Sequence, residues 1–256
     1  MNDPFDHHGV GHLSASSINE YIQNPARWLL HVSGYRDNSG IPAMWRGTAV
    51  DKAITSALLE GLSDDEAVAE ANSTFADEEA SAIANGQPVN EKKSATESAA
   101  VERYLRIALP HYRSLGKPIA SQKKVKLEYE WMPVPIIGYL DLQYEGVVRD
   151  IKTVGRLPSV VPQTVCRQLA IYATAEKALP LVDYIHSTKS SAQVVVMGVP
   201  DVEDHMKMVE RSARSMMRLL SYSSDIHEIA QLLVPNFDDW RWSGNEIEAA
   251  KKLWSL

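Results

Sequence analysis

The sequence is poor in cysteine and has no long apolar segment. Its one cysteine is Cys166, which excludes a disulfide framework, a four-cysteine zinc site and an iron–sulfur cluster held by four thiolates. No run of about 18 apolar residues occurs, and residues 1–12 lack the basic and apolar regions of a signal peptide. We therefore expect a protein that neither spans a membrane nor is secreted, and that acts in the cytoplasm.

Positive charge is also scarce. Lys and Arg number 26 against 33 Asp and Glu, which gives a formal net charge of −7. A protein that coats nucleic acid indiscriminately needs clustered cations, so that class is excluded. The sequence also lacks a Gly-x4-Gly-Lys-Ser/Thr phosphate loop, which excludes a motor of that kind. What remains is an ordinary globular composition, with 45% hydrophobic residues among 256, enough for a sizeable core.

Hydrophobic periodicity predicts a mixture of helices and strands. Residues 13–32 indicate a helical region that begins at a capping box of Ser17 and Glu20 and is kinked or divided at Asn24 and Pro25. Further helices are expected at 46–60, 63–84, 91–114, 162–178 and 202–222, and strands at 124–131, 136–144, 147–153, 181–187 and 193–197.

This order of elements predicts an α/β fold. We expect a central mixed sheet of four or five strands flanked by helices, with an N-terminal helical subdomain. No linker or internal repeat divides the chain, so a single domain is expected over residues 1–256. Its parts would be a helical wall (13–115), an α/β core (120–222) and a C-terminal loop and helix (223–256).

Three polar residues fall on two neighbouring predicted strands. If 136–144 and 147–153 form a hairpin, period-two alternation puts Asp150 and Lys152 on one face, and Asp141 can share that face. Two carboxylates so close together repel each other unless a hard divalent cation such as Mg²⁺ lies between them. A lysine beside them can hold a phosphate oxygen or orient an attacking water. The pattern therefore predicts, in outline, a metal site that hydrolyses phosphodiesters.

The next helix supplies two more candidates, Gln168 and Tyr172. They lie four residues apart, so both side chains leave one face of the helix and can reach the same cavity; each could equally be a core or interface residue. An Asp-x-Lys on a strand is, taken alone, most often part of a solvated face. The metal site is favoured because Asp141 follows an apolar Ile-Ile-Gly-Tyr-Leu run and precedes Asp150 by nine residues across a turn.

These motifs resemble those of the PD-(D/E)XK nuclease superfamily, in particular its RecB-type exonuclease branch. The family pattern is Gly-x-x-Asp, then Asp/Glu-x-Lys with a following Thr, then Gln-x3-Tyr. It is matched by Gly138–Asp141, Asp150–Thr153 and Gln168–Tyr172. The resemblance extends to the opening helix, Leu13–Trp28, and to Arg46–Asp51, which is similar to the family's Gly-Thr-x-x-His segment. It implies a restriction-endonuclease-like core.

The resemblance also implies a set of metal ligands. Asp141, Asp150 and the backbone carbonyl of Ile151 would hold Mg²⁺ or Mn²⁺, and Lys152 would assist the attacking water. Asp51 stands where family members commonly have a metal-binding histidine. Because a carboxylate is also an acceptable ligand for a hard metal, Asp51 joins the expected set, with an altered metal preference.

Other residues gain expected roles from the same resemblance. Gln168 and Tyr172 would support the positioning of substrate. Glu128 corresponds to an additional acidic residue on the preceding strand, and Glu130 shares its face by period two, so it is also a candidate.

Some members of the family carry an iron–sulfur cluster, and their cysteines stand beside the opening helix and near the C-terminus. In this chain these places are held by Asn24 and by residues 235–242, none of which is a cysteine. The resemblance therefore implies a member without such a cluster.

Basic residues recur along one late helix. They follow one another at spacings of four, three and four, and are Lys207, Arg211, Arg214 and Arg218. Such a stripe can track the phosphate backbone of DNA, and a solvated helix face with salt bridges explains the spacing equally well. Trp45 or Trp242 could stack on unpaired bases, although burial in the core is the commoner role of tryptophan.

We therefore expect a DNA nuclease that depends on Mg²⁺ or Mn²⁺. The resemblance implies an exonuclease of recombination or repair, encoded by a phage or prophage and acting in a bacterial or phage-infected cell. DNA is the expected substrate, and the candidate partners are a recombination or single-strand-annealing protein and a second copy of the chain. The first alternative is a catalytically silent nuclease fold that binds DNA or joins an assembly, with Asp51 as the sign of decay. The second is an unrelated α/β protein whose Asp-x-Lys is accidental.

Overall fold

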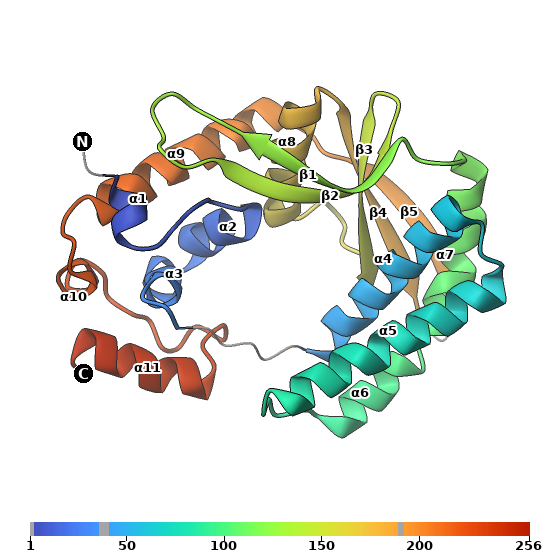
Figure 1. The fold of residues 1–256 in the computed structure, drawn as a ribbon, viewed down its shortest axis with the longest axis horizontal. Helices are drawn as coiled ribbons and strands as arrows, with labels where there is room; N and C mark the ends of the chain where they lie inside the picture. The colour runs from blue at the N-terminus through green and yellow to red at the C-terminus, as the bar shows by residue number, and fades with distance from the viewer. Residues whose placement is uncertain (1–2, 36–40, 189–191) are drawn as a thin grey trace.

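The protein is built around a mixed five-stranded sheet (Figure 1). This computed structural model describes residues 3–35, 41–188 and 192–256. The strands are β1 Ala120–Leu127, β2 Ile136–Tyr144, β3 Val147–Val154, β4 Leu179–Ser187 and β5 Ala192–Gly198. The helices are α1 Pro4–His7, α2 Ala15–Gln23, α3 Pro25–Val32, α4 Pro42–Glu60, α5 Asp64–Ala84, α6 Glu91–Ser98, α7 Val101–Leu115, α8 Gln163–Glu176, α9 Val202–Leu220, α10 Ile226–Ala230 and α11 Gly244–Trp254.

The strands lie in the order β1-β2-β3-β4-β5. β1, β2 and β3 form an antiparallel meander, β4 is parallel to β3, and β5 is antiparallel to β4. The β2–β3 turn is Glu145–Gly146, where Gly146 adopts a φ of +68°, a conformation open to glycine. The parallel pair requires a crossover, which α8 provides. The predicted α/β fold with a mixed sheet is confirmed.

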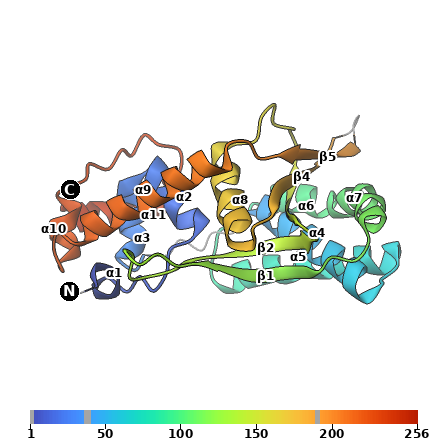
Figure 2. The same cartoon turned by 90° about the horizontal axis from the view of Figure 1, so that it is seen from above.

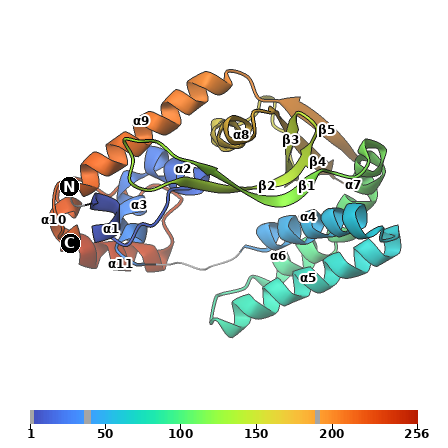
Figure 3. The same cartoon turned by 45° about the horizontal axis from the view of Figure 1, so that its top comes forward.

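Helices cover the sheet on both faces. α8 packs against β1, β2, β3 and β4, whereas α4 contacts β3, and α7 contacts β4 and β5. Figure 3 shows α4, α5 and α6 on the side of the sheet away from α8. The buried alanines Ala49, Ala53 and Ala57, spaced by four residues, let α4 approach α5 and α7 closely. The predicted N-terminal helical region is therefore also present.

The two ends of the chain pack together beside this sheet. α2 contacts α8 and α9, and α3 contacts α11; Figure 2 shows α9 running alongside α2. A short backbone bridge between Leu13 and Ile136 fastens this region to β2. None of the helices formed by the described residues has the length and apolar character needed to cross a bilayer.

Three sequence predictions about element boundaries were wrong. The strand expected at 124–131 is β1, which ends at Leu127, because the chain then turns so that Tyr129 and Trp131 pack against the core. The helix expected at 91–114 is two helices, α6 and α7. The capping box joins Ser14 and Ser17, because each side chain accepts the other's backbone N–H, so that α2 starts before Ser17. Asn24 caps α3, so the chain forms two short helices there.

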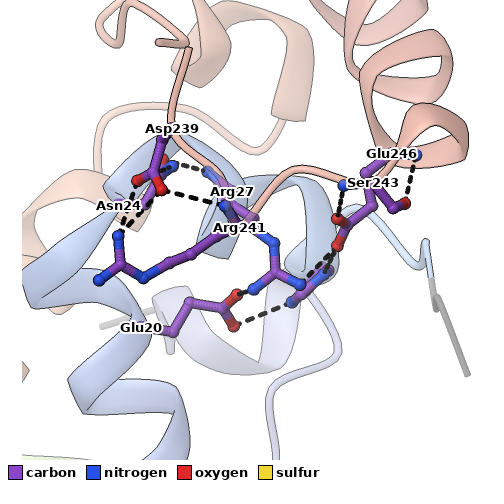
Figure 4. Close-up of polar contacts among 8 residues, drawn as sticks. Glu20, Asn24, Arg27, Asp239, Arg241, Ser243 and Glu246 are labelled. Atoms are coloured by element: carbon purple, nitrogen blue, oxygen red, sulfur yellow. Dashed lines mark hydrogen bonds and ion pairs between the residues drawn. The ribbon is translucent and has the colours of Figure 1, made fainter. Parts of the chain in front are cut away.

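A buried polar network joins α2 and α3 to the start of α11 (Figure 4). Arg27 and His31 of α3 contact the carboxylate of Glu246 at 2.7 and 3.0 Å. Glu20 of α2 contacts the same two side chains from the other side. Glu246 has no exposed surface, and it also accepts the backbone N–H of Ser243 at 2.8 Å. Arg27 and His31 therefore each contact two carboxylates, one from α2 and one from α11.

The network continues at Asn24, whose side-chain amide donates to Asp239 at 3.3 Å. Asp239 in turn accepts two hydrogen bonds from the Arg241 guanidinium, at 2.9 and 3.0 Å. Asn24 and the 235–242 segment, remote in sequence, are therefore joined directly. We call this network the polar clasp: Glu20, Asn24, Arg27, His31, Asp239, Arg241, Ser243 and Glu246.

Candidate metal centre

The strands β2 and β3 separate at Asp141. Their paired register covers Leu142–Tyr144 and Val147–Arg149. Beyond it, the backbone N–H of Ile151 donates to Oδ2 of Asp141 at 2.7 Å. The acceptor is therefore a side-chain carboxylate and not a backbone carbonyl of the paired strand. The β2–β3 pairing therefore ends beside Asp141, at the point where the sequence places the candidate metal ligands.

Asp150 lies at the centre of this site and has no exposed surface. Its Oδ2 is 2.6 Å from Nζ of Lys152, and its Oδ1 accepts a hydrogen bond from Nε2 of Gln168 at 3.2 Å. The Gln168 amide also donates to the hydroxyl of Tyr172 at 3.0 Å. The structure therefore brings these four predicted residues together, with α8 fixing the orientation of Asp150.

A third carboxylate comes from α4. Oδ2 of Asp51 accepts a hydrogen bond from Nε2 of Gln122 at 2.7 Å, and Oδ1 is buried with no hydrogen-bond partner among the residues described. Gln122 adopts a φ of +47°, in the left-handed region that non-glycine residues rarely enter. Sequence analysis missed Gln122, because no pattern in the sequence marks a strained residue within a strand.

The carboxylates shift one another's pKa values. Burial, then the charges of Asp150 and Asp51, hold the pKa of Asp141 well above its usual range. Burial and then Asp150 raise the pKa of Asp51 to about 6, and burial raises that of Asp150. Burial would lower the pKa of Lys152, but Asp150 and Asp141 outweigh it and raise that pKa above the usual value. The three acids thus share one electrostatic environment.

This donor set fits a hard divalent cation in chemistry and charge. Its side chains offer carboxylate oxygens, including Oδ1 of Asp51, which has no hydrogen-bond partner among the residues described. Among the described residues, no three Asp, Glu, His or Cys side chains are arranged so that they could hold one metal ion together. Lys152 and the Ile151 N–H occupy oxygens of Asp150 and Asp141 instead.

A second missed residue, Arg46, anchors the strand that carries Lys152. Its guanidinium donates to the backbone carbonyl of Thr153 at 3.2 Å, stacks over the ring of Tyr104 at 4.5 Å and pairs with Glu97. Arg46 is almost fully buried. These contacts fix the end of β3 against α4, α6 and α7, so they support the position of Lys152. The resemblance had included Arg46 without giving it a role.

Two predicted acidic residues are not brought to the site. Glu128 lies beyond the end of β1, is exposed, and its carboxylate is 2.6 Å from Nζ of Lys126. Glu130 is also exposed, in the turn that follows. Polar and apolar residues continue to alternate past Leu127 although β1 ends there. For this reason the sequence pattern wrongly placed Glu128 on the strand.

The predicted basic stripe lies on α9, which packs on α2 and α8. Lys207 is engaged by Glu203 and Asp204, both at 3.0 Å, and Arg214 stacks over the ring of Trp131 at 3.7 Å. Arg211 and Arg218 are exposed. Half of the stripe is therefore occupied by contacts within the protein.

The tryptophans considered for base stacking are both core residues. Trp45 and Trp242 are 3% and 7% exposed, which confirms the commoner role of tryptophan at both positions. Trp240, by contrast, is 83% exposed.

Gly138 should be intolerant of a side chain. A Cβ atom built on it would lie 2.4 Å from Cε1 of Tyr172, whose ring is 4% exposed and held by Gln168. We expect Gly138→Ala to lower the free energy of unfolding by about 1–3 kcal/mol, measured by urea denaturation. Gly198→Ala, where nothing lies within 4 Å, is the matched control, and an equal loss in both variants would contradict the steric explanation.

Known proteins resemble this chain in fold and in sequence. A presumed exonuclease from Eubacterium rectale superposes with a TM-score of 0.61, covering 96% of this chain and 90% of its own, at 13% identity. SSO0001 matches 45% of this chain and 59% of its own at 17% identity, with a TM-score of 0.31. No curated protein sequence matches. The model of the PD-(D/E)XK nuclease superfamily matches residues 12–248. This chain therefore belongs to the PD-(D/E)XK nuclease superfamily.

Proposed function

We propose that the protein is a divalent-metal-dependent deoxyribonuclease. The observation that carries the proposal is the separation of β2 and β3 around Asp141 and Asp150, with Nζ of Lys152 at 2.6 Å from Asp150. Asp51 contributes to the same electrostatic cluster, which supports a working site rather than a decayed one. Membership of a nuclease superfamily supports a nucleic-acid substrate. The likeness in fold to a presumed exonuclease makes exonuclease action the first mode to test.

The residues have distinct roles under this proposal. Asp51, Asp141, Asp150 and the carbonyl of Ile151 would hold Mg²⁺ or Mn²⁺, which when bound supplies Lewis-acid stabilisation and lowers the pKa of water. The raised pKa of Lys152 keeps it protonated. It would therefore serve as a cation toward a phosphate oxygen or the attacking water.

The residues on α8 hold this arrangement in place. Gln168 fixes the rotamer of Asp150 through its hydrogen bond to Oδ1, and Tyr172 fixes Gln168. Both are positioning residues in this scheme. On α9, Arg211 and Arg218 remain the members of the stripe proposed to contact DNA phosphates.

The proposal extends to the biological setting that the motifs imply. We place the protein in the RecB-type branch, as a nuclease of recombination or repair encoded by a phage or prophage. The proposal is supported by the motifs at Gly138–Asp141, Asp150–Thr153 and Gln168–Tyr172, which resemble those of that branch. A recombination or single-strand-annealing protein is the proposed partner.

Metal dependence and one lysine variant test the proposal. The protein should degrade end-labelled linear DNA in Mg²⁺ or Mn²⁺, and EDTA should stop the reaction. Lys152→Ala should lower the rate by about 10²–10³-fold, because a charge aimed at the reacting phosphate is lost. Lys251→Ala removes a lysine that pairs with exposed Glu248 and should leave the rate unchanged. Degradation in EDTA, or full activity of Lys152→Ala, would contradict the mechanism. Survival of covalently closed circular DNA identifies an exonuclease.

A further inference from the structure

One aromatic side chain is exposed in the middle of a strand next to the metal centre. Three aromatic residues of the described chain are exposed: Tyr139, Tyr222 and Trp240. Tyr222 and Trp240 lie in turns, whereas Tyr139 is on β2, two residues before Asp141, with 55% of its surface exposed. An aromatic ring left in water beside a candidate active site is a surface on which a flat ligand can stack.

Neighbouring residues show which way the Tyr139 side chain points. Gly138 lies against the ring of Tyr172 on α8, and Lys123 pairs with Glu176 at the end of the same helix. Because successive side chains alternate across a strand, Tyr139 and Lys124 leave the sheet on the face away from α8.

Tyr139 and Lys124 are cross-strand partners in the β1–β2 register. Their Cβ atoms are therefore about 4.5–5.5 Å apart. Lys124 is exposed and has no acidic partner in the described chain, in contrast to Lys123 and Lys126, which both pair with glutamates. An aromatic ring and an unpaired ammonium thus stand side by side.

This pair is continuous with the metal centre. Gln122, two residues before Lys124 on β1, donates to Asp51, and Asp141 is two residues after Tyr139 on β2. Two residues of a strand span about 7 Å, which is within reach of the nucleotide next to a phosphate held at the acids. The exposed pair therefore lies where a bound strand would continue.

We propose that Tyr139 stacks on an unpaired base flanking the phosphate to be hydrolysed, and that Lys124 binds the neighbouring phosphate. The inference rests on the proposed nuclease function and adds a substrate class to it: a single-stranded end of DNA. Stacking on tyrosine requires a base released from its partner, and the ammonium supplies the backbone contact that stacking lacks. Duplex DNA would have to fray before it could use this pair.

Binding measurements without turnover test the inference. A fluorescein-labelled oligothymidylate should be titrated in Ca²⁺ and followed by anisotropy. Tyr139→Ala should weaken binding roughly 5- to 150-fold, the range expected for one base stacked on an aromatic ring, whereas Tyr139→Phe should bind as wild type. Lys124→Ala should reduce the dependence of log K on log salt by about 0.7, the value for one phosphate of a single strand. Tyr222→Ala, with 61% of that tyrosine exposed elsewhere, is the matched control.

The outcomes separate this inference from the proposed function. If Tyr139→Ala binds the single strand as tightly as wild type, or loses single-strand and blunt-duplex binding equally, the stacking role is overturned even in an active nuclease. If wild type binds the oligonucleotide through Tyr139 but hydrolyses no DNA in Mg²⁺ or Mn²⁺, the stacking role stands and the proposed nuclease function fails. In an active enzyme, Tyr139→Ala should raise KM for single strands and leave kcat nearly unchanged.

Discussion

Asp141→Asn should abolish DNA hydrolysis and at the same time stabilise the fold. Burial and the charges of Asp150 and Asp51 hold the pKa of Asp141 well above its usual range. The ionised carboxylate is therefore less stable in the folded than in the unfolded protein, which lowers the free energy of unfolding at neutral pH. An uncharged asparagine removes this loss. Asparagine keeps an oxygen that can accept the Ile151 N–H. We expect a rate loss of at least about 10²–10³-fold, with a thermal midpoint at pH 7 that rises by about 2–4 °C for each kcal/mol recovered.

Asp183→Asn is the matched control for this prediction. Asp183 is a fully buried aspartate of the same sheet, but both of its oxygens accept hydrogen bonds from the Arg149 guanidinium, at 2.7 and 2.9 Å. Neutralising it leaves a buried arginine without its carboxylate, which costs about 3–5 kcal/mol. The same substitution should therefore have opposite effects at the two sites.

Metal binding gives the Asp141 prediction a second readout. A cation that binds the folded protein raises the melting temperature, so Mn²⁺ should stabilise wild type and have less effect on Asp141→Asn. A variant that melts below wild type at pH 7 in the absence of metal would show that the Asp141 carboxylate supports the fold, which contradicts its electrostatic cost.

Glu246→Ala should cause the largest loss of stability at a single position of the polar clasp. The Glu246 carboxylate is fully buried and holds Arg27, His31 and the N–H of Ser243. Its removal leaves these donors without their acceptor, and breaking a buried pair in this way costs about 3–5 kcal/mol. Urea denaturation should show the loss as a lower midpoint. Glu248→Ala changes an exposed glutamate of the same helix and should stay within about 0.5 kcal/mol of wild type.

The stability that the polar clasp contributes should depend on pH. Burial tends to lower the pKa of His31, but Glu20 and Glu246 raise it above 6.5. Burial tends to raise the pKa of Glu246, but Ser243, Arg27 and His31 lower it below 4.5. The His31 contribution is complete below pH 6.5 and is lost as pH rises through its folded-state pKa.

The Glu246 contribution has the opposite pH dependence. It is complete above pH 4.5 and is lost as pH falls through the folded-state pKa of that carboxyl. The difference between wild type and Glu246→Ala should therefore be greatest between pH 4.5 and 6.5. A difference that stays constant from pH 5 to pH 9 would exclude His31 from the clasp's energetics.

Short-range patterns in the sequence were enough to predict two side-chain contacts of the candidate site. Period-two alternation placed Asp150 and Lys152 together, and period-four spacing placed Gln168 beside Tyr172; the structure has both pairs in contact. These predictions succeeded because strand and helix geometry alone fixes such neighbours. The role of Asp51 came from the resemblance to a family, since no local pattern connects a helix with strands about ninety residues further along the chain.

The errors arose where tertiary packing overrides a local pattern. Glu128 continues the alternation of β1, but packing of Tyr129 and Trp131 ends the strand before it. Gln122 combines a left-handed conformation with a hydrogen bond to Asp51, a residue 71 positions earlier in the chain. The clasp joins residues 215 positions apart, such as His31 and Glu246, and neither residue stands out from its sequence neighbours. Contacts of this kind can be identified only from the three-dimensional structure.

The meeting of the two chain ends has a consequence for biosynthesis. Synthesis delivers α2 and α3 well before α9 and α11, and their apolar side chains, such as Trp28 and Leu29, are buried in the final fold. Their partners on α9 and α11 follow about 180 residues or more later in the chain. Until then, these helices emerge with an uncovered hydrophobic face, and closing so long a loop costs entropy before any contact repays it. The apolar side chains of α2 and α3 are thus open to aggregation until α9 and α11 have been synthesised.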